Sequence, residues 1–535
     1  MAKYVFGIDL GTTYSCIAYV DDTGRATVIN NSEGTNTTPS VVNFASPTQV
    51  VVGQVAKETA VIEPQNTVSL VKTLMGKSDF VINYNGEDKS PEEVSAYILR
   101  KLASDASKMI DSEVNDVVIT CPAYFGTAER TATKNAGVIA GLNVLEIISE
   151  PTAAALYYGC TKEQETKTIL VYDLGGGTFD VTIMSISSDK IEVICSDGNH
   201  ELGGKLWDEA LMRYLASEFV TQTGFDGEFD EYAQQDLRLK AEKAKQQLSS
   251  REEVPVMLDA AGLRAKINVS RNTFNEMTSA LLNESIDKTD AAIAVAKSKG
   301  YEVSEILLVG GSTWMPQVPE ILKQKYGMTP KILEPDEAVA KGAAIHAVNV
   351  YIKKLPSPEP GQTVTSEQPP LPPKPVRIGG SSGGNTDLPP IIIVATTKSY
   401  ALRVLVDGEP KCYNMIVKNE ALSDGSVSVT RQFGTADANM ESADIIVFEN
   451  DFMDEYFNVD DDYILGTASL ELPPNLPEGS PIEVTFTLNT EGLLEVNGRD
   501  LTSGKNVQAT MQAKGIMAAA KVEEIKSKSK DIIVM

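Results

Sequence analysis

Two short glycine-rich stretches, each joining two apolar segments, carry the residue types that hold phosphate groups. The first lies in YVFGIDLGTTYSCIAYV (4–20) and the second in TILVYDLGGGTFDVTIM (168–184). Each has an aspartate, Asp9 or Asp173, where its first apolar segment ends. Glycines let several backbone N–H groups approach a phosphate, and a carboxylate holds hydrated Mg²⁺ through water. One such turn fits an ordinary hairpin, but two predict related half-domains that share a triphosphate site.

The rest of the sequence narrows the chemistry of this site. It contains no GxxxxGK[ST] motif, and no GxGxxG follows the first apolar segment, so neither common nucleotide motif applies. His200 and His346 are the only histidines of the chain. Carboxylates and lysines must therefore carry any acid–base work.

Two kinds of pattern indicate how the chain positions these turns. As far as about residue 350, β-branched segments such as 115–120 and 305–311 alternate with helical ones such as 90–110 and 230–248, which predicts an α/β architecture. After about residue 388 the pattern is all-β, with a clear hairpin at 481–498. We therefore divide the chain into 1–353 (α/β), 354–388 (a flexible Pro/Gly/Ser-rich linker), 389–515 (a β-sandwich) and 516–535 (a short tail).

Composition bears on whether the protein binds nucleic acid, associates with membranes or is secreted. The 535 residues carry a formal net charge of −27, which argues against direct DNA binding by the surface as a whole. We find neither a signal peptide nor an apolar run of about 18 residues, and five cysteines are scattered without a CxxC pair. We therefore expect a soluble cytoplasmic protein that does not associate with membranes.

Several longer stretches resemble the heat-shock protein 70 (DnaK) family. They are 119–159, LVGGSTWMP (308–316), PDEAVAKGAAI (335–345) and, in the β part, 463–497. The resemblance implies an actin-like (duplicated ribonuclease-H-like) two-lobed ATPase domain, followed by an all-β substrate-binding-like domain. It also implies ATP and Mg²⁺ as cofactors.

The resemblance also implies a set of site residues. At the phosphates it marks Asp9, Gly11, Thr12, Thr13, Tyr14, Lys72, Glu150, Asp173, Gly175, Gly176, Gly177, Thr178 and Asp180. Of these, Lys72, Glu150, Asp173, Thr178 and Asp180 match catalytic positions, and Asp9 and Asp173 match those that hold Mg²⁺ through water. At the nucleoside end it marks Glu242, Lys245, Gln246, Gly310, Gly311, Ser312, Trp314 and Asp336.

Two departures from the family lie at single positions. Gln246 and Trp314 stand where the family stacks adenine between two arginines, and the indole of Trp314 either stacks on a purine or packs on a neighbouring helix. Glu146 stands where the family has an arginine that pairs with the Asp of a J-protein's His-Pro-Asp loop. Reversing that charge makes the contact repulsive.

Three further departures concern whole segments. The family's short leucine-rich linker docks as a strand, whereas 354–388 leads into Pro389 and Pro390, which cannot donate ladder hydrogen bonds. Only about 20 residues follow residue 515, so we expect no helical lid. The segment 448–463 is acidic and aromatic, which fits either a solvated loop or a groove for one extended partner.

These departures suggest two functions. The first is an atypical member, similar to the Ssz-type subunit of the ribosome-associated complex. It would bind ATP with little or no hydrolysis, pair stably with a zuotin-type J-protein, reach the ribosome through that partner and assist an ordinary family member. The second is an active ATP-hydrolysing, peptide-binding chaperone. A sugar kinase on the same fold is disfavoured by the β domain.

Overall fold

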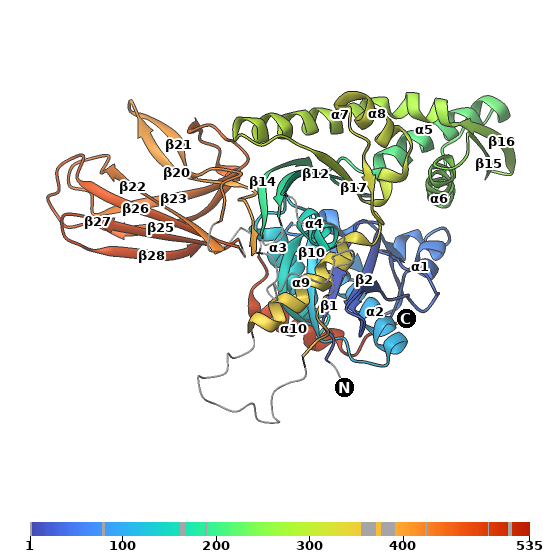
Figure 1. Ribbon diagram of the computed structural model, residues 1–535, viewed down its shortest axis with the longest axis horizontal. Coiled ribbons are helices and arrows are strands. Elements are labelled where there is room, and N and C mark those ends of the chain that lie inside the picture. Colours follow the sequence, from blue (N-terminus) through green and yellow to red (C-terminus); the bar gives the residue numbers. More distant parts are fainter. Residues whose placement is uncertain are drawn as a thin grey trace.

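The computed structural model describes residues 3–77, 81–160, 166–187, 190–354, 371–375, 391–422, 425–490, 492–511 and 516–535. It has a two-lobed α/β part and a separate β domain that projects from it (Figure 1). Most of the linker expected at 354–388, and both Pro389 and Pro390, lie outside the described residues.

Lobe I is built on a mixed sheet with the order β11-β10-β1-β2-β3, with the short β4 also paired to β2. Strands β1 and β2 form the antiparallel pair that flanks the first glycine-rich turn, and β10 and β11 add in parallel. The bounds are β1 Phe6–Asp9, β2 Tyr14–Val20, β3 Ala26–Val28, β4 Thr38–Pro39, β10 Asp116–Cys121 and β11 Asn143–Ser149.

Lobe II repeats this topology. Its sheet has the order β18-β17-β12-β13-β14-β19, in which β12 to β14 are antiparallel and β17 and β18 add in parallel. The bounds are β12 Lys167–Leu174, β13 Phe179–Ile186, β14 Lys190–Asn199, β17 Glu305–Val309, β18 Lys331–Ile332 and β19 Ile391–Ile393. The duplication expected from the two glycine-rich turns is therefore present in the fold.

Smaller sheets extend both lobes. Lobe I carries the sheet β29-β6-β5-β7 and the hairpin β8–β9, and lobe II carries the hairpin β15–β16. The bounds are β5 Val42–Ser46, β6 Gln49–Val52, β7 Thr67–Val68, β8 Ile82–Tyr84, β9 Glu87–Lys89, β15 Glu253–Ala260, β16 Leu263–Ser270 and β29 Ile533–Val534.

Helices cover the sheets and join the lobes. The helical segments expected at 90–110 and 230–248 are present as α2 and α6. Ser90 accepts from the N–H of Glu93, and Asp230 accepts from the N–H of Ala233, as N-caps do. Helices α4 and α9 share one apolar core with strands of both sheets. A Cβ on Gly342 would lie 1.7 Å from the carbonyl oxygen of Ala153, so only glycine permits this close crossing.

The helices have the following bounds. They are α1 Gln54–Thr59, α2 Pro91–Ile110, α3 Thr127–Ile139, α4 Glu150–Cys160, α5 Gly204–Thr223, α6 Glu231–Leu248, α7 Arg271–Ser298, α8 Gln317–Tyr326, α9 Ala338–Lys354 and α10 Ala519–Ser529. Among the described residues, no helix is both long and apolar enough to cross a membrane.

The β domain consists of two facing sheets, β24-β21-β20-β23-β25 and β22-β26-β27-β28. Alternate residues of both sheets, such as Val447 and Phe486, form one core. The bounds are β20 Ser399–Val406, β21 Glu409–Ile416, β22 Ser426–Gly434, β23 Ser442–Asn450, β24 Tyr456–Asn458, β25 Ile464–Glu471, β26 Pro481–Asn489, β27 Leu494–Asp500 and β28 Asn506–Met511.

The segment that enters the β domain corrects one expectation. We expected it to be too slack and too proline-rich to dock as a strand, and this is wrong. Residues Ile391–Ile393 form β19, which pairs in parallel with Lys190–Glu192 of lobe II. The strand lies within the range 389–515 assigned to the β domain, yet it belongs to the sheet of lobe II. Three consecutive isoleucines supply the β propensity, and the prolines precede the paired residues.

Docking of β19 leads to a first prediction. Ile392 packs against the shared core of α4, α9 and the two sheets, so Ile392→Asp would place a charge there. Backbone amides of residues 190–193 should exchange with solvent at least about tenfold faster than in the wild type, measured by hydrogen exchange and mass spectrometry. Ile392→Val should leave the exchange unchanged. Equal exchange in both variants would mean that β19 does not stay docked in solution.

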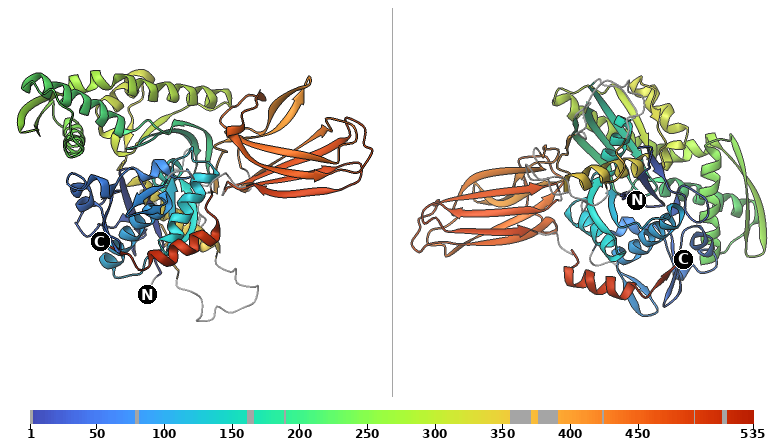
Figure 2. Two further views of the ribbon diagram at one scale, coloured as in Figure 1. Left: turned by 180° about the vertical axis from the view of Figure 1, so that it is seen from behind. Right: turned by 60° about the horizontal axis from the view of Figure 1, so that its bottom comes forward.

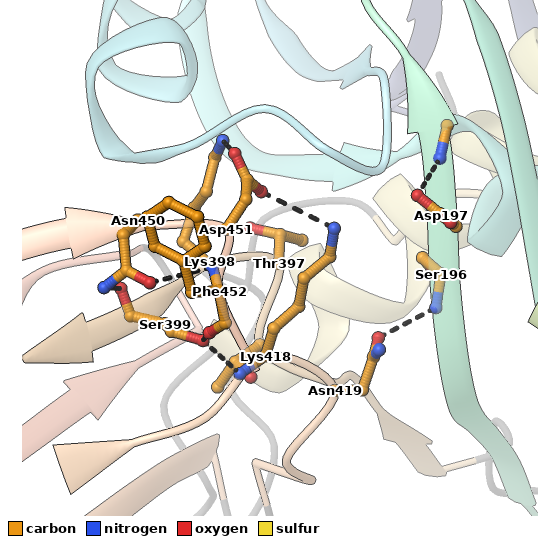
Figure 3. Close-up of polar contacts among 12 residues, drawn as sticks. Ser196, Asp197, Thr397, Lys398, Ser399, Lys418, Asn419, Asn450, Asp451 and Phe452 are labelled. Carbon is orange, nitrogen blue, oxygen red and sulfur yellow. Dashed lines mark hydrogen bonds and ion pairs between the residues drawn. The ribbon is translucent and has the colours of Figure 1, made fainter. Parts of the chain in front are cut away.

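Polar contacts also hold the β domain against lobe II (Figure 3). The side chain of Asn419 points across the interface, and its Oδ1 accepts from the N–H of Ser196 at 2.9 Å. Lys299, which directly follows α7, donates to the carbonyl oxygen of Asn419 at 2.7 Å. Within the β domain, Asp451 pairs with Lys398 at 2.6 Å and thereby fixes the loop beside this interface. The two domains are therefore joined by partly buried hydrogen bonds between named groups.

The final segment, 516–535, returns to lobe I. Its helix α10 packs beside α3, and its strand β29 joins the edge of β6, far from the β strands that precede it (Figures 1 and 2). The sequence indicated at most one short helix there, which is present. Its attachment to lobe I was not expected.

Candidate functional site

A cavity of about 510 Å³ lies between the two lobes. Both glycine-rich turns open into it, as do η2 (Val71–Leu74) and η3 (Gly311–Trp314). The expected residues that line it are Asp9, Gly11, Thr12, Thr13, Tyr14, Lys72, Glu150, Asp173, Gly175, Gly176, Thr178, Glu242, Lys245, Gln246, Gly310, Gly311, Ser312, Trp314 and Asp336. Gly177 and Asp180 lie behind this lining.

The two glycine-rich turns lie directly against each other. A Cβ on Gly176 would lie 2.3 Å from Oγ1 of Thr13, so a side chain there would close the space between the turns. Ser40 donates to the carbonyl oxygen of Gly11 at 2.8 Å and fixes the first turn. The two turns form a narrow, backbone-lined cradle of the size and polarity that a phosphate chain requires.

Three buried carboxylates and one that is partly exposed lie at the closed end of the cavity, and within the described part of the chain one lysine lies among them. They belong to Asp9, Glu150, Asp173 and Asp180, and Lys72 forms a short ion pair with Glu150. Burial, followed by repulsion from Glu150, raises the pKa of Asp9 to about 7 and also raises the pKa values of Asp173 and Asp180. This cluster has an excess of negative charge that a bound cation would relieve.

The donor set fits Mg²⁺. Hard oxygen ligands suit this ion, and Asp9 and Asp173 lie on the cavity wall, where each could hold its water shell. Oδ2 of Asp180 accepts from the N–H of Ala123 at 3.3 Å, whereas its buried Oδ1 has no hydrogen-bond partner among the described residues. An unpaired buried carboxylate oxygen beside three other carboxylates is the kind of group that a cation or its water would satisfy.

The opposite end of the cavity is open and holds the groups expected near a nucleoside. Trp314 is 48% exposed, so it does not pack on a neighbouring helix as the alternative supposed, and its Nε1 donates to Asp336 at 2.9 Å. Lys245 pairs with Asp208 at 2.8 Å and donates to the carbonyl oxygen of Gly204 at 3.0 Å. Gln246 lies beside Glu242 on α6. An indole face and several hydrogen-bonding groups therefore meet where a purine nucleoside would lie.

The comparisons with known proteins agree with this geometry. The family described as "Hsp70 protein" matches residues 5–352 and 382–533. The chain belongs to the Hsp70 family.

Three relatives give the level of similarity, and each is a protein named "Chaperone protein DnaK". That of Thermosipho melanesiensis is 37% identical over 524 residues, which cover 96% of this chain and 80% of the relative. The protein of Thermosipho africanus is 37% identical over 514 residues, which cover 94% of this chain and 79% of the relative. That of Thermotoga maritima is 37% identical over 515 residues, again covering 94% and 79%. Hsp70 proteins are chaperones that bind ATP with Mg²⁺, so this chain is a chaperone of the Hsp70/DnaK type.

Several residues that line the cavity were not expected from the sequence: Thr37, Gly204, Asp208, Ser249, Ser250, Val309, Met315, Pro335 and Val339. Asp208 and Gly204 line it from α5, and burial raises the pKa of Asp208 to about 6. The Gly-Gly pair in ELGGKLWDEA, directly before a helix, was the signal available in the sequence. Lys57 of α1 does not line the cavity itself but contacts Tyr14 and Glu242, which do; it was not expected either, because a single lysine in a short helix offers no comparable signal.

Lys57 joins the two lobes across the cavity mouth. Its Nζ lies 2.6 Å from Glu242 of lobe II and donates to the hydroxyl of Tyr14 at 2.9 Å. Burial disfavours the charged amine, but Glu242 outweighs this effect, and the pKa of Lys57 is raised. The bridge therefore remains charged at neutral pH and holds the lobes together.

Removal of this bridge should open the cavity. For Lys57→Ala we expect the dissociation rate of a fluorescent ATP analogue, measured by stopped flow, to rise about five- to thirtyfold. Lys57→Arg, which keeps the charge, should show a smaller increase. An unchanged rate in Lys57→Ala would show that the bridge does not limit nucleotide release.

The departure at Glu146 has a structural consequence within the chain itself. Oε1 of Glu146 lies 3.3 Å from Nε2 of His346 on α9. Burial raises the pKa of the Glu146 carboxyl, but His346 and nearby lysines outweigh burial, so the pKa of Glu146 is lowered. Both residues line a cavity of about 380 Å³ that also includes Ile392 of β19 and Tyr400 of the β domain. Glu146 is thus part of the junction between the two domains.

The acidic, aromatic segment 448–463 is partly ordered as a strand. Residues Tyr456–Asn458 form β24 on the edge of β21, and Phe452 and Phe457 pack ring against ring at 4.9 Å. A shallow hollow lined by Tyr456, Phe457 and Tyr463 lies beside this edge. The segment therefore combines a short edge strand with a largely exposed loop.

Proposed function

We propose that this protein is an ATP-hydrolysing, peptide-binding chaperone in which bound nucleotide controls the β domain. The observation that carries the proposal is β19. This strand is part of the lobe II sheet, and a short connection leads from it into β20 of the β domain. A movement between the lobes would therefore act on the β domain through a paired strand and not through a slack tether.

The residues of the cavity suit phosphoryl transfer to water. Mg²⁺ bound with ATP would neutralise phosphate charge, and Lys72 would add a second positive charge at the γ-phosphate. Glu150, already paired with Lys72, would accept a hydrogen bond from the attacking water. Asp180 and Thr178 lie behind and beside this point and would order the surrounding water. Positioning and charge supply the catalysis, because no histidine lines the cavity.

A second function is the scaffold role, with stable pairing to a zuotin-type J-protein and attachment to the ribosome through it. The observation that favours it is Glu146. A carboxylate tied to His346 at the domain junction would repel an aspartate of a partner's His-Pro-Asp loop. In this role ATP would stabilise the closed lobes as a bound ligand, with little or no turnover.

Single-turnover hydrolysis of pre-bound ATP separates the two functions. We expect measurable turnover that a J-domain protein accelerates, together with faster release of a bound fluorescent peptide when ATP is added. ATP that stays bound and intact for hours, with no effect of ATP on the peptide, would overturn the proposal and favour the scaffold role.

The charge at position 146 can be tested in the same assay. Glu146→Arg restores the charge that the family resemblance predicts, while Glu146→Gln removes the charge without reversing it. A larger J-domain acceleration in Glu146→Arg than in Glu146→Gln would show that the natural carboxylate weakens this partnership.

A further inference from the structure

The segment 516–535, here called the strap, occupies a formed site on lobe I. The apolar side of α10, Val522 and Ile525, packs against Ala96 of α2 and Ile139 of α3. Both strap residues are less than 10% exposed. The strap is therefore held by a buried contact and does not simply lie on the surface.

Arg100 of α2 fixes the point where the helix of the strap ends. Its guanidinium donates from Nη1 to the carbonyl oxygen of Ser529 at 2.5 Å and from Nη2 to that of Ile532 at 2.9 Å. Ser529 is the last residue of α10, where its carbonyl oxygen also accepts from the N–H of Ile532 at 3.2 Å, and Ile532 lies three residues beyond the helix. The arginine therefore holds both carbonyls at the point where the chain turns from α10 toward β6.

Strand β29 then extends the sheet of β6. The N–H of Ile533 donates to the carbonyl oxygen of Thr48 at 2.9 Å, and the N–H of Val52 donates to that of Met535 at 2.9 Å. Val534 packs onto the core of lobe I, whereas the side chain of Ile533 is 60% exposed. The backbone of β6 is therefore paired on both sides, with β5 and with the strap.

The position of β6 connects the strap to the nucleotide cavity. The strand ends at Val52, and α1 begins at Gln54, so Lys57 lies five residues beyond the last hydrogen bond to the strap. Lys57 is the residue that bridges to Glu242 across the cavity mouth. A strand that anchors β6 also limits the movement of α1 and of this lysine.

We propose that the strap couples docking of the β domain to closure of the nucleotide cavity. The chain leaves the β domain at β28 and reaches lobe I as the strap, so displacement of that domain pulls on α10 and β29. With the strap seated, α1 is held and Lys57 stays on Glu242. With the strap displaced, β6 loses one neighbour, α1 moves more freely and nucleotide leaves faster. The inference rests on the proposed function in that it assumes nucleotide in this cavity.

The test uses two substitutions at one exposed position. Ile533→Pro removes the hydrogen bond to Thr48, and Ile533→Ala keeps it, and neither removes a buried side chain. We expect dissociation of a fluorescent ATP analogue from the full chain to be about three- to tenfold faster in Ile533→Pro, and unchanged in Ile533→Ala. In a Lys57→Ala background the proline should have no further effect, because the bridge through which it acts is gone.

A second measurement does not need nucleotide. Amides of residues 54–60 should exchange faster in nucleotide-free Ile533→Pro than in Ile533→Ala. Unchanged exchange and unchanged dissociation would overturn the inference, as would a proline effect of equal size with and without Lys57. If the wild type binds no nucleotide but the exchange responds as expected, the proposed function fails while the strap still controls α1.

Discussion

Hydrolysis of bound ATP should fall by about 100- to 1,000-fold when Lys72 is replaced by alanine. Among the described residues, Lys72 is the one cation that lies between the four carboxylates at the closed end of the cavity. Burial lowers the pKa of Lys72, but the attraction of Glu150 and Asp9 outweighs burial, so that the pKa is raised. It therefore carries its charge at neutral pH and is available to the γ-phosphate. Binding of ATP should change much less, because the turns and the nucleoside end of the cavity remain. Single-turnover hydrolysis and equilibrium binding of the same sample measure both effects.

Two further variants keep this test decisive. Removal of one partner of a buried ion pair destabilises proteins by about 3–5 kcal/mol, so Lys72→Ala could lose activity through unfolding. Lys72→Arg keeps the charge but changes its position, and it should remain folded with strongly reduced turnover. Lys77→Ala makes the same chemical change at an exposed residue and should hydrolyse ATP normally. Normal turnover in both Lys72 variants would show that this lysine is not catalytic.

The second large effect concerns the stability of the nucleotide-free protein. Asp9→Asn should stabilise it by about 2–3 kcal/mol more at pH 8 than at pH 5. The pKa of Asp9 is raised from 3.8 to about 7, mainly by burial and then by Glu150. Between these two values the folded state holds a proton that the unfolded state has lost. The stability due to neutral Asp9 is thus fully present below pH 3.8, falls steadily as the pH rises from 3.8 to 7, and is absent above that value. Asparagine is neutral at every pH and avoids this loss.

Denaturant unfolding at pH 5 and pH 8, in EDTA, measures the effect. Asp22→Asn serves as the control, because Asp22 is exposed and its Oδ1 accepts from the hydroxyl of Tyr4, as an asparagine oxygen also could. The same Asp9 variant should lose most of the rise in melting temperature that ATP and Mg²⁺ give the wild type. Equal destabilisation by Asp9→Asn at both pH values would contradict the assignment of Asp9 as a strained, ionised group that a cation relieves.

Asp9 and Lys72 differ in how well a sequence pattern can predict a site residue. Asp9 and Asp173 were found because each follows an apolar segment and precedes a glycine-rich turn, and such local patterns fix local backbone geometry. Lys72 was found only through the family resemblance. No local pattern distinguishes it from the exposed Lys77 five residues later, since its role depends on burial beside Glu150.

The same distinction applies to the fold as a whole. The sequence by itself determined the α/β repeat, the β domain and the two phosphate turns, because apolar periodicity and glycine placement act over a few residues. Only the tertiary structure decided that Ile391–Ile393 dock on β14, that Lys57 bridges to Glu242 and that the strap pairs with β6. Each of these contacts joins segments more than 180 residues apart in the chain. Their stability comes from buried area and from backbone hydrogen bonds available at sheet edges, which a local sequence pattern does not encode.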